Sequence, residues 1–247
     1  PPQTAAPAPQ PVKQLPVEAF AALPFVEMPS LSPDGTHMAG LFGTSGTQNI
    51  VIAPIFGRIP QLTALEVMDM NEVDWIRWVG NDNIIVGLRA LRGVEGSNWY
   101  VYRMIGVNRI TRKVTRILWD AGGQMASNVL HIPTDGSTHI LVSAQDSIYS
   151  NLPEFWPTVY SVDVTTGGKT IVQRPRTNLM WWGADDQARI RTGVASQQGG
   201  TRSILYYRPD SDSALRQVQR VNLAEDEEHS IPFHFVANSD RAYILEN

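Results

Sequence analysis

Apolar and polar positions along the chain fall into short β-type segments separated by turn residues. LSPDGTHMAGLFG at 31–43 runs from an apolar residue through a Pro-Asp-Gly turn into an apolar strand, and IPTDGSTHILVSA at 132–144 repeats that pattern. More degenerate copies occupy 78–88, 182–193 and 235–247. Asp, Asn and Gly suit such turns because they tolerate positive φ, and Asx side chains bond to nearby backbone amides. The pattern therefore predicts a hairpin that recurs along the chain.

The recurring unit is about 50 residues long. The equivalent turn positions Asp34, Asn81, Asp135, Asp185 and Ser239 give spacings of 47, 54, 50 and 54 residues. Each spacing can hold four strands of about six residues with their turns. A β-sandwich is the alternative, but it shows turn signals every 8–12 residues or so without a longer unit in which a whole hairpin returns. The spacing predicts an all-β chain, a β-propeller of four-stranded blades.

The second half of each unit also recurs, as alternating segments rich in Val, Ile and Tyr, which favour strands. Third strands are expected at 48–55, 98–105, 157–164 and 203–210. Turns at Thr165–Lys169 and Gly106–Arg112 lead into fourth strands. The count is four blades and the start of a fifth. Because propellers close into a ring, the propeller in this chain is expected to be incomplete.

The beginning of the chain has a different composition. Residues 1–14, PPQTAAPAPQPVKQ, are Pro, Ala and Gln with one charge and two further residues, too little apolar surface to fold. They are expected to be a disordered leader before a partial propeller domain at 15–247, in which PVEAFAALP at 16–24 forms a short N-terminal helix. Such leaders often follow a cleaved export signal, so a periplasmic or secreted location is expected; a boundary inside a linker is the alternative.

Composition removes several classes of function. The 247 residues contain no cysteine, which excludes disulfides, thiolate zinc sites and cysteine nucleophiles. The net charge is −4 with scattered basic residues, so no nucleic-acid partner is expected. No apolar stretch approaches the roughly 20 residues of a membrane span. His37 and His139 share one repeat position and are expected to be structural, and no metal or cofactor site is predicted.

Three other features are open to a functional or a structural interpretation. The acidic run Glu225–Glu228 could bind a peptide's free amine, although such runs are more often solvated. Trp75, Trp78, Trp181 and Trp182 precede two of the turns and are expected to pack between blades rather than line a binding surface. The Gly-rich pieces GTSGTQN and SQQGGTR precede no helix, so neither is expected to hold a phosphate.

The pairing of PVEAFAALP with a following LSPDG resembles the opening of a known propeller. It is similar to the N-terminal propeller of bacterial serine peptidases of the prolyl oligopeptidase family, including acylaminoacyl-peptidase-like and dipeptidyl-aminopeptidase-like members. The resemblance is carried by Phe20, Leu23, Pro24 and Leu31–Gly35, with YSVDVTTGG at 160–168. It implies a non-catalytic propeller that caps an α/β-hydrolase domain and restricts entry to small peptides. LSPDG also recurs in propellers of the periplasmic Tol system.

No catalytic residue is predicted in the chain. The hydrolase domain of that family carries a Gly-x-Ser-x-Gly motif followed by Asp and His. The motif does not occur in the 247 residues, and Ser45 lies in Gly-Thr-Ser-Gly, which lacks its spacing. The expected partners are the α/β-hydrolase domain of a parent chain and short peptides. The alternatives are a Tol-type interaction propeller with no associated enzyme and a self-contained propeller enzyme such as a lyase or glycosidase.

Overall fold

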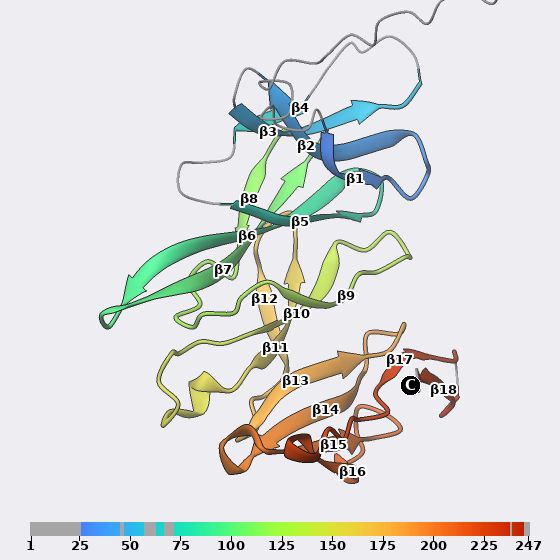
Figure 1. Cartoon of the computed structure of the whole chain (residues 1–247). Helices are drawn as coiled ribbons and strands as arrows, with labels where there is room; N and C mark the ends of the chain where they lie inside the picture. The colour runs from blue at the N-terminus through green and yellow to red at the C-terminus, as the bar shows by residue number, and fades with distance from the viewer. Residues whose placement is uncertain (1–25, 45–46, 57–62, 67–71, 238, 245–247) are drawn as a thin grey trace, which may run out of the picture.

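The computed structural model describes residues 26–44, 47–56, 63–66, 72–237 and 239–244. They form four antiparallel sheets of four strands each and a fifth sheet of two strands, arranged one after another in an arc (Figure 1). The leader expected at 1–14 and the helix expected at 16–24 lie outside the described residues. The helices within the described part are short 3₁₀ turns, none of them long and apolar enough to cross a membrane.

Each four-stranded sheet is one blade, and its strands pair in the order in which they occur along the chain. Blade 1 consists of β1 (Val26–Leu31), β2 (His37–Thr44), β3 (Thr47–Pro54) and β4 (Thr63–Glu66). Blade 2 consists of β5 (Glu72–Val79), β6 (Asn83–Val94), β7 (Ser97–Asn108) and β8 (Val114–Ile117). Blade 3 consists of β9 (Asn128–His131), β10 (His139–Ala144), β11 (Thr158–Asp163) and β12 (Lys169–Gln173). Blade 4 consists of β13 (Leu179–Ala184), β14 (Ile190–Gln197), β15 (Arg202–Tyr207) and β16 (Arg216–Asn222), and the fifth sheet consists of β17 (Pro232–Phe235) and β18 (Ala242–Ile244).

The predicted architecture is confirmed: four blades and the first two strands of a fifth sheet. All five equivalent turn positions lie between the first and second strands of their sheets. Asp34 shows the turn chemistry, since its carboxylate accepts hydrogen bonds from the Ser32 hydroxyl at 2.6 Å and the Thr36 amide at 3.0 Å. These bonds lower the pKa of Asp34 to about 2, and the bond from Ser32 contributes most to this shift. Asp185 makes the equivalent bond in blade 4.

The core lies between the blades, and the second strands of the inner blades bury both faces. In β6, Ile84 and Val86 pack into the cluster shared with blade 1, whereas Ile85 packs into the cluster shared with blade 3. In β10, Ile140 belongs to the cluster shared with blade 2, and Leu141 to the cluster shared with blade 4. Because successive side chains of a strand point to opposite faces, two-sided burial explains why these strands read as continuous apolar runs.

Two tryptophans tie neighbouring blades together at the first strands. The indole N–H of Trp78 donates to the carbonyl of Ser30 at 2.9 Å, which joins β5 to β1. The indole N–H of Trp182 donates to the carbonyl of Pro157 at 2.8 Å, which joins blade 4 to blade 3. The predicted packing between blades is thus confirmed for these two buried residues. Trp75 is partly buried against the cluster between blades 2 and 3, but the prediction is wrong for Trp181, which is 56% exposed because it points to the opposite face of β13.

The YSVDVTTGG segment forms the end of β11 and the turn before β12. Asp163 loses favourable hydration through partial burial, but its carboxylate accepts bonds from the Thr165 amide (2.9 Å) and from the hydroxyls of Thr165 (2.8 Å) and Thr166 (2.9 Å). The bonds outweigh the burial and hold its pKa at about 2. Gly167 follows at φ +78°, where a Cβ would lie 2.9 Å from the carbonyl oxygen of Arg116. The turn therefore requires both its carboxylate and its glycine.

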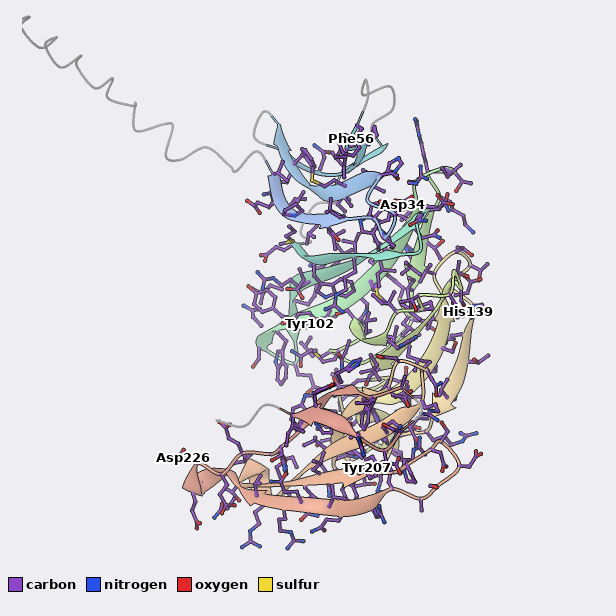
Figure 2. The ribbon with its side chains drawn as sticks, turned by 90° about the vertical axis from the view of Figure 1, so that its right-hand side faces the viewer. Asp34, Phe56, Tyr102, His139, Tyr207 and Asp226 are labelled. Carbon is purple, nitrogen blue, oxygen red and sulfur yellow. The ribbon has the colours of Figure 1, made fainter. Side chains whose placement is uncertain are left out.

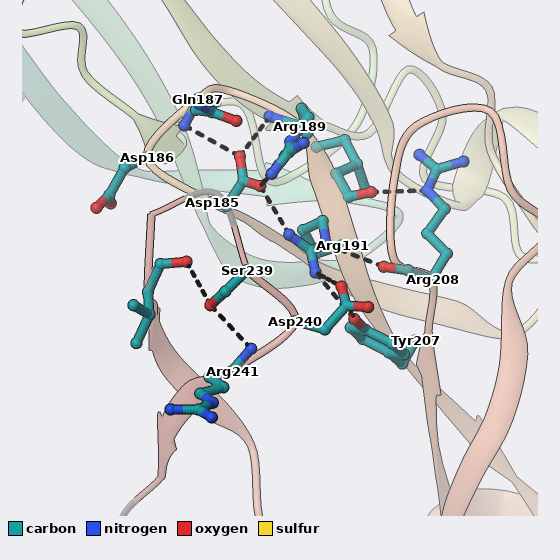
Figure 3. A network of polar contacts seen from close by, with 12 residues as sticks. Asp185, Asp186, Gln187, Arg189, Arg191, Tyr207, Arg208, Ser239, Asp240 and Arg241 are labelled. Carbon is teal, nitrogen blue, oxygen red and sulfur yellow. Dashed lines mark hydrogen bonds and ion pairs between the residues drawn. The ribbon is translucent and has the colours of Figure 1, made fainter.

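A buried guanidinium joins blade 4 to the fifth sheet (Figure 3). Arg191 is 0% exposed, and its Nη1 lies 3.0 Å from a carboxylate oxygen of Asp185. Its Nη2 donates to the Tyr207 hydroxyl and to Asp240, both at 2.9 Å, and its Nε donates to the carbonyl of Arg208 at 3.0 Å. Asp240 lies in the turn between β17 and β18 and also accepts a bond from the Tyr207 hydroxyl at 2.8 Å, so Arg191 and Tyr207 together hold that turn against blade 4.

Replacing Arg191 tests the importance of this buried charge. We expect Arg191→Met to lower the free energy of unfolding by about 3 kcal/mol, because removing one partner of a buried ion pair leaves the other carboxylate poorly neutralised. Arg189, 2.7 Å from Asp185, limits the loss. Asp240→Asn is the control, with a loss below about 1 kcal/mol, since the Asp240 side chain is 67% exposed. Urea unfolding measures both; equal losses would contradict the central role of Arg191.

Acid unfolding tests the turn at Asp163. A folded-state pKa of about 2 lies below the value of about 3.9 for an unfolded Asp. The ionised carboxylate therefore stabilises the fold fully above about pH 4, and this contribution disappears as the pH falls towards 2. We expect Asp163→Asn to lower the melting temperature near neutral pH and the difference from the unaltered chain to shrink between pH 4 and 2. A difference that stays constant over this range would contradict the assignment.

Candidate ligand-binding cavity

The candidate site is a cavity of about 670 Å³ at one rim of the arc. The rim carries the turns between the second and third strands of blades 2 to 4. Figure 2 shows Tyr102 and Asp226 along this edge, opposite Asp34 and His139. The walls come from β7, from the segment between β8 and β9, from the segment between β10 and β11, and from β13. The lining residues are Val94, Glu95, Ser97, Trp99, Val101, Arg103, Gly122, Gly123, Gln124, Met125, Gln145, Ile148, Ser150, Phe155 and Met180.

The longest wall is half of an extended hairpin. β6 pairs with β5 only as far as Arg89, and β7 pairs with β8 only from Met104 onward. The strands beyond these points pair with each other alone, up to the pair Val94 and Ser97. The β6–β7 hairpin therefore projects past its own sheet, and in Figure 1 it extends away from the rest of blade 2.

One face of β7 supplies four consecutive wall positions. Ser97, Trp99, Val101 and Arg103 alternate along the strand and all line the cavity, as the two-residue period of a strand requires. Trp99, at the projecting end, is 50% exposed, whereas Arg103, near the sheet, is partly buried. The wall thus runs from an exposed aromatic side chain to an enclosed cation.

Backbone carbonyls hold the Arg103 guanidinium in place. Nη1 donates to the carbonyls of Tyr102 at 2.7 Å and Gly123 at 3.1 Å, and Nη2 donates to the carbonyl of Ala121 at 2.7 Å. Burial lowers the pKa of Arg103, but an arginine side chain still keeps its charge at physiological pH. Among the described residues, no carboxylate forms an ion pair with it.

Two glycines allow the segment between β8 and β9 to lie against the neighbouring backbone. A Cβ on Gly122 would lie 2.6 Å from the carbonyl oxygen of Asp146, and one on Gly123 would lie 2.3 Å from the Cβ of Gln145. The Gly123 amide donates to the Gln145 carbonyl at 3.0 Å, and the Tyr102 amide donates to the Gln124 carbonyl at 2.8 Å. These contacts fix the carbonyl groups that hold Arg103.

Gln145 connects the cavity floor to its far wall. Its side chain accepts a bond from the Met125 amide at 3.3 Å and donates to the Phe155 carbonyl at 3.0 Å. Phe155 and Met180 also line a second cavity, of about 610 Å³, between blades 3 and 4. The two cavities therefore adjoin along the same rim. The second one also contains Gly199 and Gly200 of the SQQGGTR piece, which form the turn between β14 and β15.

The histidines and the acidic run that the sequence singled out lie away from the cavity. His37 and His139 are the first residues of β2 and β10, as expected from their shared repeat position. The run Glu225–Glu228 is exposed after β16, where a Glu227 carboxylate oxygen accepts a bond from the Asn222 amide at 2.7 Å. The described residues contain no cluster of three or more His, Cys, Asp or Glu side chains suited to a metal ion. Ser45 lies outside the described residues.

A Ser–His contact occurs in blade 4, but its surroundings do not suit catalysis. The Ser203 hydroxyl lies 2.8 Å from Nε2 of His229, and the Gln219 side chain lies 3.4 Å from Nδ1. Ser203 is only 5% exposed and lies within β15, which is paired on both sides by β14 and β16. An acyl-transfer nucleophile must instead project from the sheet to meet a substrate carbonyl. Ser203 also lines neither of the two cavities.

Sequence reasoning missed the residues that define the cavity. Arg103 lies in the segment recognised as a third strand, but nothing in the sequence says that its charge has no acidic partner. The adjacent Gly122 and Gly123 offered the available signal, because a glycine pair between strands often marks a close backbone approach. The sequence also shows that Trp99, Val101 and Arg103 alternate along one strand face. It does not show the cavity that this face lines.

No protein-family model and no curated protein matches the chain. Solved structures with a similar arrangement include an acylaminoacyl peptidase in complex with Z-Gly-Gly-Phe-chloromethyl ketone (13% identity, TM-score 0.48, covering 79% of this chain and 32% of that one). An oligogalacturonate lyase in complex with manganese gives 12% identity and a TM-score of 0.47, covering 86% and 56%. TolB from Acinetobacter baumannii gives 11% identity and a TM-score of 0.41, covering 78% and 43%. The chain thus spans between a third and somewhat over half of these proteins, and identities this low assign no activity to it.

The close backbone approach at Gly123 is testable by adding one methyl group. We expect Gly123→Ala to lower the free energy of unfolding by about 1–3 kcal/mol, because the new Cβ would overlap backbone atoms of Gln145 that cannot move aside freely. Gly93→Ala in β6 is the matched control, since its Cβ would meet only the Asn98 side chain at 4.0 Å. Chemical denaturation compares the two variants. If both behave alike, the segment is not packed as described.

Proposed function

We propose that the chain is the non-catalytic propeller domain of an exported serine peptidase. In this role it restricts entry to short peptides and positions them for an α/β-hydrolase domain of the parent protein. The opening PVEAFAALP and LSPDG motifs support the proposal, and its non-catalytic part is consistent with 247 residues that contain no Gly-x-Ser-x-Gly motif. Export is supported by the Pro/Ala-rich composition of residues 1–14.

The observation that carries the proposal is the rim cavity. Its volume of about 670 Å³ falls within the range of roughly 300–1,000 Å³ that is typical of small-ligand sites. One wall is the face of an extended strand, with a cation at one end and apolar side chains along it. A cavity of this size can take a few residues of extended peptide but not a folded protein. Size selection of this kind is what a gating domain must perform.

A second candidate is a Tol-type propeller that binds a protein partner and has no associated enzyme. The same rim exposes several large apolar side chains, which are Leu91, Trp99, Tyr100, Tyr149 and Leu152. Aromatic residues that stand exposed near one another are typical of protein interfaces. This candidate predicts tight binding of a folded partner, whereas the peptidase proposal predicts a hydrolase domain encoded in the same gene.

Two measurements on the gene and its products separate these candidates. The reading frame beyond Asn247 is expected to encode Gly-x-Ser-x-Gly followed by Asp and His within a few hundred residues. We expect the 247-residue chain to hydrolyse no chromogenic peptide or ester and to resist fluorophosphonate labelling, while the longer gene product is labelled. A stop codon after two or three further blades would refute the peptidase proposal. Labelling of the short chain at Ser203 would overturn its non-catalytic assignment.

A further inference from the structure

The guanidinium of Arg103 forms no ion pair with a carboxylate of the described residues, in contrast to several other arginines. Arg89, Arg109, Arg189 and Arg191 each form an ion pair with an Asp or Glu side chain. Arg208 is partly buried without a direct pair, but Asp210 and Asp212 lie near enough to oppose the effect of burial on its pKa. Burial lowers the pKa of Arg103, and no Asp or Glu among the described residues forms an ion pair with it. A cation enclosed without a counter-charge favours the approach of an anion.

Arg103 also has N–H groups that donate no hydrogen bond to the described residues. A guanidinium has five N–H groups, and the three carbonyls of Tyr102, Gly123 and Ala121 use two on Nη1 and one on Nη2. The Nε–H and the second Nη2 N–H find no acceptor among the described residues. Since those residues contain no enclosed side-chain nitrogen or oxygen without a partner, Nε must be accessible. Arg103 is one of the residues that line the cavity.

The cavity wall beside the Arg103 guanidinium carries apolar side chains, and the acidic side chain of the cavity lies far from it. Val101 and Trp99 precede Arg103 on the same face of β7, and Met125 and Phe155 lie on the other walls of the cavity. Glu95 is the one acidic side chain of the described residues that lines the cavity, and the Tyr149 hydroxyl donates to it. Glu95 precedes Ser97, which is about 20 Å along β7 from Arg103 at a rise of roughly 3.3 Å per residue. The acid is thus at the far end of the wall.

We propose that the cavity binds the free C-terminal carboxylate of a short peptide at Arg103, with an apolar terminal side chain against Val101 and Trp99. The backbone carbonyls fix the guanidinium in advance, so that little side-chain entropy is lost on binding. A carboxylate can accept both remaining N–H groups, and such charge-assisted bonds are stronger than neutral ones. The site itself rests on the contacts of Arg103, whereas the identification of the ligand as a peptide rests on the proposed function.

Binding of matched peptides to the 247-residue chain tests the site. The probes are Gly-Ala-Phe with a fluorophore on its N-terminus, either as the free acid or as the C-terminal amide, followed by fluorescence anisotropy at low ionic strength. We expect the acid to bind at least about tenfold more tightly than the amide, since the amide loses the charge-assisted bonds. Equal affinities for the two peptides on the unaltered chain would overturn the proposal.

Variants locate the carboxylate. We expect Arg103→Gln to abolish the preference for the acid, and Arg103→Lys to retain part of it, because a lysine keeps the charge but loses the planar fork. Arg112→Gln, which removes one charge in the turn between β7 and β8, serves as the control and should keep the full preference. Circular dichroism and thermal unfolding verify that each variant is folded. A full preference in folded Arg103→Lys and Arg103→Gln would place the carboxylate elsewhere and refute the assignment.

Competition distinguishes a peptide from another apolar carboxylate. 3-Phenylpropanoate carries the same charge and ring without a peptide backbone. We expect it to displace the labelled acid only at concentrations at least about tenfold above those of unlabelled Gly-Ala-Phe. Equal potency would refute a peptide ligand while leaving the carboxylate site standing. The peptidase proposal would instead fail through the reading frame beyond Asn247. The binding measurements do not depend on that reading frame, so the two failures can be told apart.

Discussion

The burial of both faces of the second strands is the constraint on which the rest of the molecule depends. Ile84 and Ile85 are neighbours in β6, yet they belong to different apolar clusters, one on each side of blade 2. No inner blade can bury both of these faces alone, so its stability is shared with the blades beside it, as in other repeat architectures. Trp78 and Trp182 each add a directional hydrogen bond to this packing, from the first strand of one blade to the preceding blade. Arg191 extends the same coupling to the fifth sheet through charge.

The repeat could be predicted because its signals are local. Asp34 and its counterparts recur where a tight turn demands them, and the apolar runs that follow occupy strands covered on both sides. Trp181 and Trp182 show the limit of such reasoning. The two tryptophans are adjacent in the sequence, and nothing in their position before the turn separates them. In the folded chain, however, Trp182 is buried in the core and Trp181 is exposed to solvent. The outcome depends on the register of β13, which the sequence alone does not specify.

The cavity could not be predicted from the sequence for a related reason. Its wall residues are ordinary for a third strand, and the lack of an ion pair at Arg103 within the described part of the chain depends on several segments distant in sequence. Arg103 is held by carbonyls from the segment between β8 and β9, and that segment is held by Gln145 of the following blade. The site is therefore a product of blade packing, even though no residue of the apolar clusters lines it.

The projecting β6–β7 hairpin gives the cavity one wall that the core does not support. Its base is fixed by β5, β8 and the Tyr102 amide, while no third strand of the described residues pairs with the ladder from Ala90 and Val101 onward. At the tip, the Glu95 carboxylate accepts a hydrogen bond from the Tyr149 hydroxyl, which links the hairpin to the segment between β10 and β11. The ribbon is therefore attached at both ends, like a bridge, and Trp99 lies on the span between them. Loss of the Tyr149 contact would leave the mouth of the cavity bounded by a two-stranded ribbon without support at its tip, whereas Arg103, next to β8, would keep its own support.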